Sequence, residues 1–139
     1  MIQRIQTLWL FLASAAGILS LKYPFFSGLK PDARQMTLLT DLNGTSHFLL
    51  LVLSVAVSVA ALLSIFLYKD RRFQLRISVI TLLIAIGNLV FYFYLTGKFS
   101  SGHYALTSLF AFLVPVFLIL AIRGIYRDQK LVKEADRLR

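Results

Sequence analysis

The sequence predicts an all-α integral membrane protein, a single transmembrane domain in which four helices form an antiparallel bundle. Three observations support this fold class. Hydrophobic residues make up 58% of the 139 residues and charged residues only 15%, whereas soluble domains contain about 45–50% and about 25%. Four long stretches carry no charged side chain. Most of the basic side chains lie before the first stretch, between the second and the third, and after the fourth.

The four uncharged stretches are residues 5–21, 48–68, 77–97 and 99–122. A helix of roughly 17–25 predominantly apolar residues crosses a bilayer. Lipid leaves the backbone amides of such a segment no partner outside their own helix. We therefore expect helices over residues of about 5–24, 47–68, 75–96 and 104–125, followed by a tail over 126–139.

The first stretch has a second interpretation. A basic Arg4, an apolar run and the small residues 13–16 are typical of a secretory signal peptide with its cleavage site. The apolar character continues past the small residues through Ile18, Leu19 and Leu21. We therefore expect this stretch to be retained as a membrane helix.

The basic side chains predict the orientation of the bundle. The N-terminus, the link 69–76 and the tail 123–139 together hold 11 of the 15 basic residues, and the other two loops hold 4. Segments rich in lysine and arginine remain in the cytoplasm. Because an even number of spans puts both ends on one side, we expect both termini in the cytoplasm.

The same distribution predicts the partners. Basic residues placed where helices leave the membrane are typical of contact with anionic lipid headgroups. No module of interleaved aromatic and basic residues accompanies them, so we expect no nucleic-acid binding.

Each stretch carries a stripe of small or weakly polar residues at helical spacing, which predicts the helix contacts in lipid. A path for a substrate along the same stripes is the alternative interpretation. The stripes consist of Ala13, Gly17 and Ser20; of Ser54, Ser58 and Ala61; of Ser78, Thr81, Ala85 and Asn88; and of Thr107, Ala111 and Pro115.

The sequence offers little chemistry. Ionisable residues within spans mark ion paths and catalytic groups in membrane proteins, and the four stretches contain no Asp, Glu, Lys or Arg. Asn88 is the only strongly polar side chain near the middle of a stretch, where an interhelical hydrogen bond explains it. Cysteine is absent, and no serine-hydrolase, phosphate-loop or metalloprotease motif is present. We expect no enzymatic activity and no cofactor.

A weaker hypothesis concerns the outer face. His47 and His103 are expected to open the second and fourth helices at similar depth, near Asp41. Two imidazoles there could bind a metal, haem or a quinone headgroup. The alternative is that each histidine is a polar residue at a helix start.

The tail predicts an amphipathic helix. Leu131, Ala135 and Leu138 fall on one helical face, and charges of both signs occupy the rest. Such a helix either continues the fourth span, lies along the membrane surface or docks on a protein partner.

Three segments resemble one family: MIQRIQ at residues 1–6, LYKDRRFQLR at 67–76 and KLVKEADRLR at 130–139. It is a group of small four-span membrane proteins from Gram-negative bacteria, known only as a domain of unknown function. The middle segment departs from the family's pattern at Asp70, where asparagine is expected. The resemblance implies a multi-pass protein of the bacterial inner membrane and supplies no activity.

All three segments lie on the expected cytoplasmic face, so we place the candidate interaction surface there. Within it, Gln3, Gln6, Asp136 and Arg137 are expected to form one polar cluster. The residues that match the family's pattern are Gln3, Arg4, Gln6, Arg72, Gln74, Arg76, Lys130, Ala135, Asp136, Arg137 and Arg139.

The function expected from the sequence is a non-enzymatic accessory or assembly subunit of the inner membrane that acts through its cytoplasmic face. It would bind a protein partner or a second copy of the chain. A carrier of small solutes or lipids is the alternative, and the outer histidine site is a third hypothesis.

Overall fold

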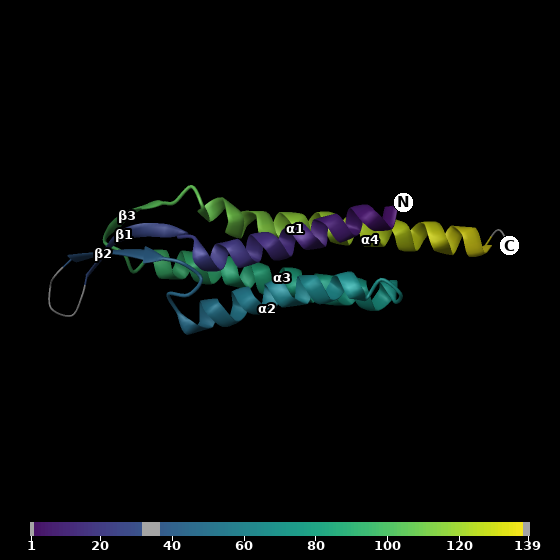
Figure 1. Ribbon diagram of the computed structural model, residues 1–139, viewed down its shortest axis with the longest axis horizontal. Helices are drawn as coiled ribbons and strands as arrows, with labels where there is room; N and C mark the ends of the chain where they lie inside the picture. The colour runs from purple at the N-terminus through teal and green to yellow at the C-terminus, as the bar shows by residue number, and fades with distance from the viewer. Residues whose placement is uncertain (1, 32–36, 138–139) are drawn as a thin grey trace.

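Four long helices lie side by side in the computed structural model, which describes the backbone of residues 2–31 and 37–137 and the side chains of 5–31 and 39–137. Figure 1 shows both termini at one end and a small β-sheet at the other. We call these the terminal end and the sheet end. The helices are α1 (Ile2–Lys22), α2 (Phe48–Phe66), α3 (Arg71–Thr96) and α4 (Ser108–Arg137).

The helices form a square bundle. The main contacts of α1 are with α2 and α4, and those of α3 are also with α2 and α4. The prediction of four helices is therefore confirmed. The fourth helix differs from expectation, because α4 begins at Ser108 rather than near residue 104 and runs without a break to Arg137. Of the three arrangements considered for the tail, the structure shows continuation of the fourth helix.

Side chains at two helix starts satisfy free backbone amides. His47 precedes α2 and its imidazole Nδ1 accepts the amide hydrogen of Leu49 at 3.2 Å. Asp70 precedes α3, and its carboxylate accepts the amide hydrogen of Phe73 at 3.2 Å. These caps supply acceptors for donors that have no partner within the first turn of a helix.

A three-stranded antiparallel sheet, which the sequence did not predict, lies beside the predicted helical bundle. β1 (Phe26–Pro31) pairs with β2 (Thr37–Leu42) on one side and with β3 (Ser101–Tyr104) on the other. Two links expected to be loops thus form one sheet. Gly28 and Gly102 lie opposite each other, and a Cβ built on Gly28 would lie 2.9 Å from the Cα of Gly102. The close approach of β1 and β3 therefore requires glycine at these positions.

Aromatic side chains join the sheet to the bundle. Phe25, which directly precedes β1, is buried and stacks on Tyr92 of α3 with ring centroids 4.5 Å apart. It also meets Tyr104 edge to face at 5.9 Å. Such contacts favour one fixed position of the sheet above the helices.

Small polar residues fill the centre of the bundle, as the stripes predicted. The hydroxyl of Ser14 donates to the carbonyl of Ser58 across α1 and α2, and the amide of Asn88 donates to the hydroxyl of Ser54 at 3.0 Å. The expected interhelical hydrogen bond of Asn88 is thus confirmed. Pro115 is only partly buried, and Val114 faces the interior in its place.

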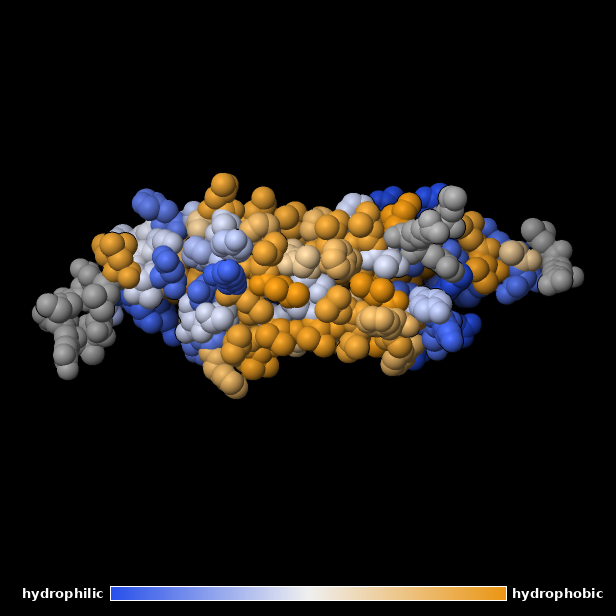
Figure 2. Space-filling model, viewed as in Figure 1, coloured by the Kyte–Doolittle hydropathy of each residue, from blue (hydrophilic) through white to orange (hydrophobic). Residues whose placement is uncertain are grey.

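The outside of the bundle is apolar along most of its length. Figure 2 shows a broad hydrophobic belt over the helices, with hydrophilic residues toward both ends. All four helices are long and apolar enough to cross a membrane. Exposed leucine, valine, isoleucine and phenylalanine side chains on every helix have no covering element in the described part of the chain. An apolar surface of this extent is typical of contact with lipid.

Candidate functional site

The terminal end contains a cleft of about 450 Å³ that is lined by residues of all four helices. We call it the terminal cleft. It combines polar side chains from α1, α3 and α4 with apolar and aromatic side chains from the end of α2. Its lining consists of Gln6, Thr7, Ile65, Phe66, Tyr68, Arg71, Gln74 and Asp128. Its volume lies within the range of small-molecule sites, roughly 300–1,000 Å³.

Gln6 ties α1 to α4 at this cleft. Its side chain is 5% exposed, and its amide nitrogen donates to the carbonyl of Gly124 at 3.0 Å. A Cβ built on Gly124 would lie 3.0 Å from the Cγ of Gln6. The glycine therefore allows the two helices to approach closely enough for this hydrogen bond.

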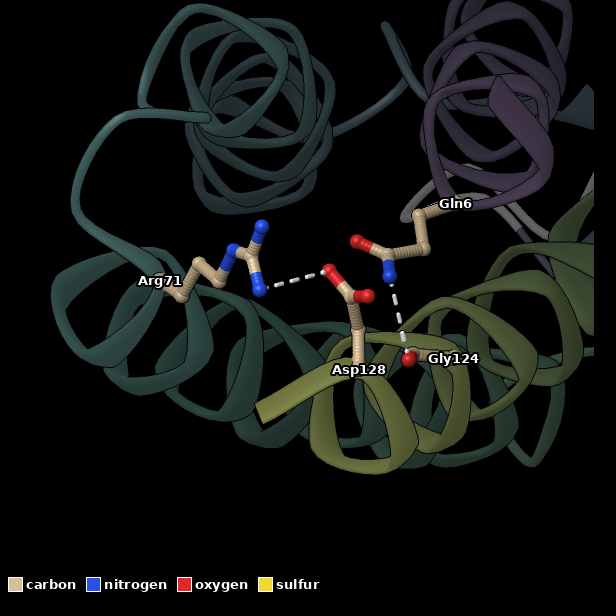
Figure 3. A network of polar contacts seen from close by, with 4 residues as sticks. All are labelled: Gln6, Arg71, Gly124 and Asp128. Carbon is tan, nitrogen blue, oxygen red and sulfur yellow. Dashed lines mark hydrogen bonds and ion pairs between the residues drawn. The ribbon is translucent and has the colours of Figure 1, made fainter. Parts of the chain in front are cut away.

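Arg71 and Asp128 join α3 to α4 by an ion pair. The Nη1 atom of Arg71 lies 3.3 Å from the Oδ2 atom of Asp128, and the two side chains are 28% and 13% exposed. In Figure 3 the side chains of Gln6, Arg71 and Asp128 point toward one another from three helices. Removing either partner of a largely buried pair leaves the other charge without a counter-charge, which destabilises the protein. The ion pair therefore helps to hold α3 against α4.

Gln74 makes a third contact at this end. Its amide nitrogen donates to the carbonyl of Ser64 at 2.8 Å, which ties the start of α3 to the last turn of α2. Gln74 is 4% exposed. Two of the three glutamines that the sequence placed on an interaction surface, Gln6 and Gln74, thus lie inside the bundle.

The remaining predicted surface residues are spread along the terminal end. Arg72 and Arg76 are exposed on the first turns of α3. Lys130 lies 4.0 Å from Glu134 in an exposed ion pair on α4, and Ala135, Asp136 and Arg137 are exposed near the end of that helix. Gln3 and Arg4 lie in the first turn of α1, where only the backbone is described, and Arg139 lies outside the described residues.

The predicted polar cluster is wrong for the residues that the structure describes. Gln6 packs against Gly124, whereas Asp136 and Arg137 follow twelve or more residues later on the same straight helix. That separation corresponds to roughly 18 Å along the axis, at 1.5 Å per residue. The helix does not fold back, so Gln6 does not reach Asp136 or Arg137.

The two histidines and Asp41 lie at the sheet end. His47 caps α2 and meets the ring of Phe91 edge to face, and His103 belongs to β3 instead of opening the fourth helix. Asp41 and His103 are the partners of Ser27 on either side of β1. Among the described residues, no three His, Cys, Asp or Glu side chains gather closely enough to hold a metal ion.

Sequence reasoning missed Arg71, Gly124 and Asp128. It placed all six acids outside the spans and left Asp128 in the tail beyond the fourth span. The buried positions of α4 are Ala111, Val114, Leu118, Ala121, Ile125 and Asp128. Their alternating spacing of three and four residues is the signal that places Asp128 on the buried face.

The comparisons with known proteins identify a family and no activity. Residues 2–138 match the family described as domain of unknown function DUF4293, and the chain belongs to it. No curated protein and no solved structure matches the chain.

Proposed function

We propose that this member of the DUF4293 family is a multi-pass protein of the bacterial inner membrane, with both termini in the cytoplasm. We further propose that it works as a non-enzymatic accessory or assembly subunit through its terminal end. The support for the orientation is the concentration of 11 of the 15 basic residues in the N-terminus, the link and the tail.

The observation that carries the subunit role is the extension of α4 beyond the bundle. Asp128 is the last buried residue of α4, and residues 130–137 are all exposed. Nine helical residues after Asp128 correspond to roughly 14 Å, and Figure 1 shows the helix passing the α2–α3 turn. Leu131 and Val132 are 44% and 41% exposed on this extension. A partner helix would bury them.

The contacts at the base of the extension favour docking over a loose tail. The hydrogen bond of Gln6 to Gly124 and the ion pair of Asp128 with Arg71 fix the direction in which α4 leaves the bundle. A surface that is rigid before binding loses less conformational entropy when a partner docks.

Recovery of a partner from the native membrane tests this role. An affinity tag is inserted between β1 and β2, at the end opposite to the extension, and the protein is extracted mildly for mass spectrometry. We expect one protein in fixed ratio, lost on truncation after Gln129 and reduced by Leu131→Ser. Leu39→Ser is the matched control, because it makes the same change at a side chain that is 84% exposed on β2, at the sheet end. Full recovery by the truncated protein would contradict the proposal.

Reporter fusions test the orientation separately. Alkaline phosphatase inserted between β1 and β2 should be active, because it folds only outside the cytoplasm. A fluorescent protein fused to the C-terminus should fluoresce. The opposite pattern would reverse the proposed orientation without affecting the subunit role.

The carrier alternative receives little support from this conformation. The cavity among Gly17, Ser54 and Asn88 at the level of the polar stripes measures about 10 Å³, whereas one water needs roughly 10–15 Å³. If the protein is recovered alone or only with further copies of itself, flux measurements in liposomes become the deciding experiment.

A further inference from the structure

A second cleft, of about 440 Å³, lies at the terminal end between the α2–α3 turn and the last turns of α4. We call it the basic cleft, and it shares Arg71 with the terminal cleft. Its charged lining consists of Lys69, Arg71, Arg72 and Lys133 against Asp70 and Asp136.

The basic side chains in the lining of this cleft outnumber the acidic ones by four to two. The carboxylate of Asp70 accepts the amide hydrogen of Phe73. Within the described part of the chain, Lys69, Arg72 and Lys133 form no ion pair. Like charges held close together repel one another, so an anion in the cleft would stabilise this arrangement.

A donor in the lining of this cleft also lacks an acceptor. The Nε2 atom of Gln129 is buried and has no hydrogen-bond partner among the described residues. Arg71 also lines the cleft, and its Nη1 atom is paired with Asp128 at 3.3 Å. Buried donors without acceptors destabilise a protein and call for an explanation. A phosphate group carries several acceptor oxygens and a negative charge, and it matches the fork of an arginine side chain.

We propose that the basic cleft binds the phosphate of an anionic phospholipid. The choice of a lipid follows from the position of the cleft, because Phe66 and Phe73 beside it are 75% and 48% exposed and belong to the apolar surface. The cleft thus lies where α2 and α3 leave the apolar belt, which is the level of the headgroups. The proposal rests on the membrane placement given above and needs no protein partner.

Native mass spectrometry of the purified protein in detergent micelles tests this site. Phosphatidylglycerol is the anionic probe, phosphatidylcholine the zwitterionic one, and inorganic phosphate tests for a soluble ligand. We expect one phosphatidylglycerol to be retained in preference to phosphatidylcholine. Lys69→Gln with Arg72→Gln should weaken that binding roughly 25-fold, at about a factor of five for each basic side chain.

The matched control is Arg123→Gln with Arg127→Gln, which removes two exposed basic charges from α4 outside the cleft. This control should leave lipid binding nearly unchanged. Equal loss in both double variants would overturn the proposal, because it would indicate general charge attraction. Equal binding of both lipids would overturn it as well. Displacement of the lipid by inorganic phosphate would show a site for a soluble phosphate and overturn the lipid assignment.

Gln129→Glu provides an independent variant of nearly unchanged shape. It replaces the unpartnered amide by a carboxylate on the α4 side of the cleft. We expect weaker binding of phosphatidylglycerol because the carboxylate repels phosphate, and unchanged binding would count against the site. The measurement uses micelles and does not depend on orientation or on a partner, so it can fail while the proposed function stands.

Discussion

Asp128→Asn should lower the free energy of unfolding by about 2 kcal/mol, between the effects of breaking exposed and buried ion pairs. At 3.3 Å the attraction between Arg71 and Asp128 amounts to about 5 kcal/mol before desolvation is subtracted, at an effective dielectric constant of 20. Breaking a fully buried pair costs about 3–5 kcal/mol, and an exposed pair is worth about 0–1 kcal/mol. Because Arg71 is 28% exposed and its partner 13%, the expected loss lies between these limits.

Glu134→Gln is the matched control for this variant. It makes the same change from acid to amide on the same helix, in a pair whose side chains are 70% and 58% exposed and 4.0 Å apart. The control should change the stability by less than about 0.5 kcal/mol. Titration with SDS in mixed micelles, followed by circular dichroism, gives the free energy of unfolding for both variants. Equal effects of the two substitutions would refute the reasoning that burial makes the Asp128 pair important.

Three further substitutions test the packing of the bundle and the sheet. Gly17→Ala should lower the free energy of unfolding by about 1–3 kcal/mol, because the new Cβ would meet the hydroxyl of Ser58. Adding Ser58→Ala to the same chain should restore most of this loss, and SDS titration compares the single and the double variant. Asn88→Ala should lower the free energy of unfolding by about 0.6 kcal/mol, the average for an interhelical hydrogen bond in a membrane protein. No change would mean that the hydrogen bond between Asn88 and Ser54 does not stabilise the folded bundle over the unfolded state in the membrane. Gly102→Val should separate β3 from β1, because its Cβ would lie 2.7 Å from the Cα of Gly28; amide hydrogen exchange should then rise in those strands and stay constant in the helices.

The sequence predicted the helical part of the fold because lipid imposes a simple rule. A span must be long, apolar and helical, and all four stretches are read directly from the absence of charge. The stripes followed from the need for small residues at helix contacts. The sheet was not predictable in the same way. Its strands come from two links that are far apart in the chain, and the pairing of Gly28 with Gly102 depends on contacts that no local pattern specifies.

The family-like segments lie at the terminal end, where the structure has two clefts, but the sequence did not predict which side chains line them. The family-like segments led to the terminal end and to Gln6 and Gln74, yet the sequence alone treated these glutamines as surface residues. Their burial depends on carbonyl acceptors at Gly124 and Ser64 on neighbouring helices. Asp128 was missed for a related reason. A charged residue beyond an apolar stretch is normally solvated, and only the partner on α3 makes its burial tolerable.

Arg71 links the two clefts, and one substitution tests that link. Arg71 lines both clefts, and its guanidinium contacts Asp128. A phosphate in the basic cleft therefore competes with the Asp128 carboxylate for the same positive charge.

Asp128→Asn should consequently strengthen the binding of phosphatidylglycerol by about fivefold, the effect of releasing one basic side chain, although it destabilises the bundle. Native mass spectrometry measures this, with Glu134→Gln as the control that should bind the lipid as the unmodified protein does. Weaker binding by Asp128→Asn would mean that the carboxylate holds Arg71 in the position that the lipid requires. In that case the ion pair would support the cleft, and the two anions would not compete.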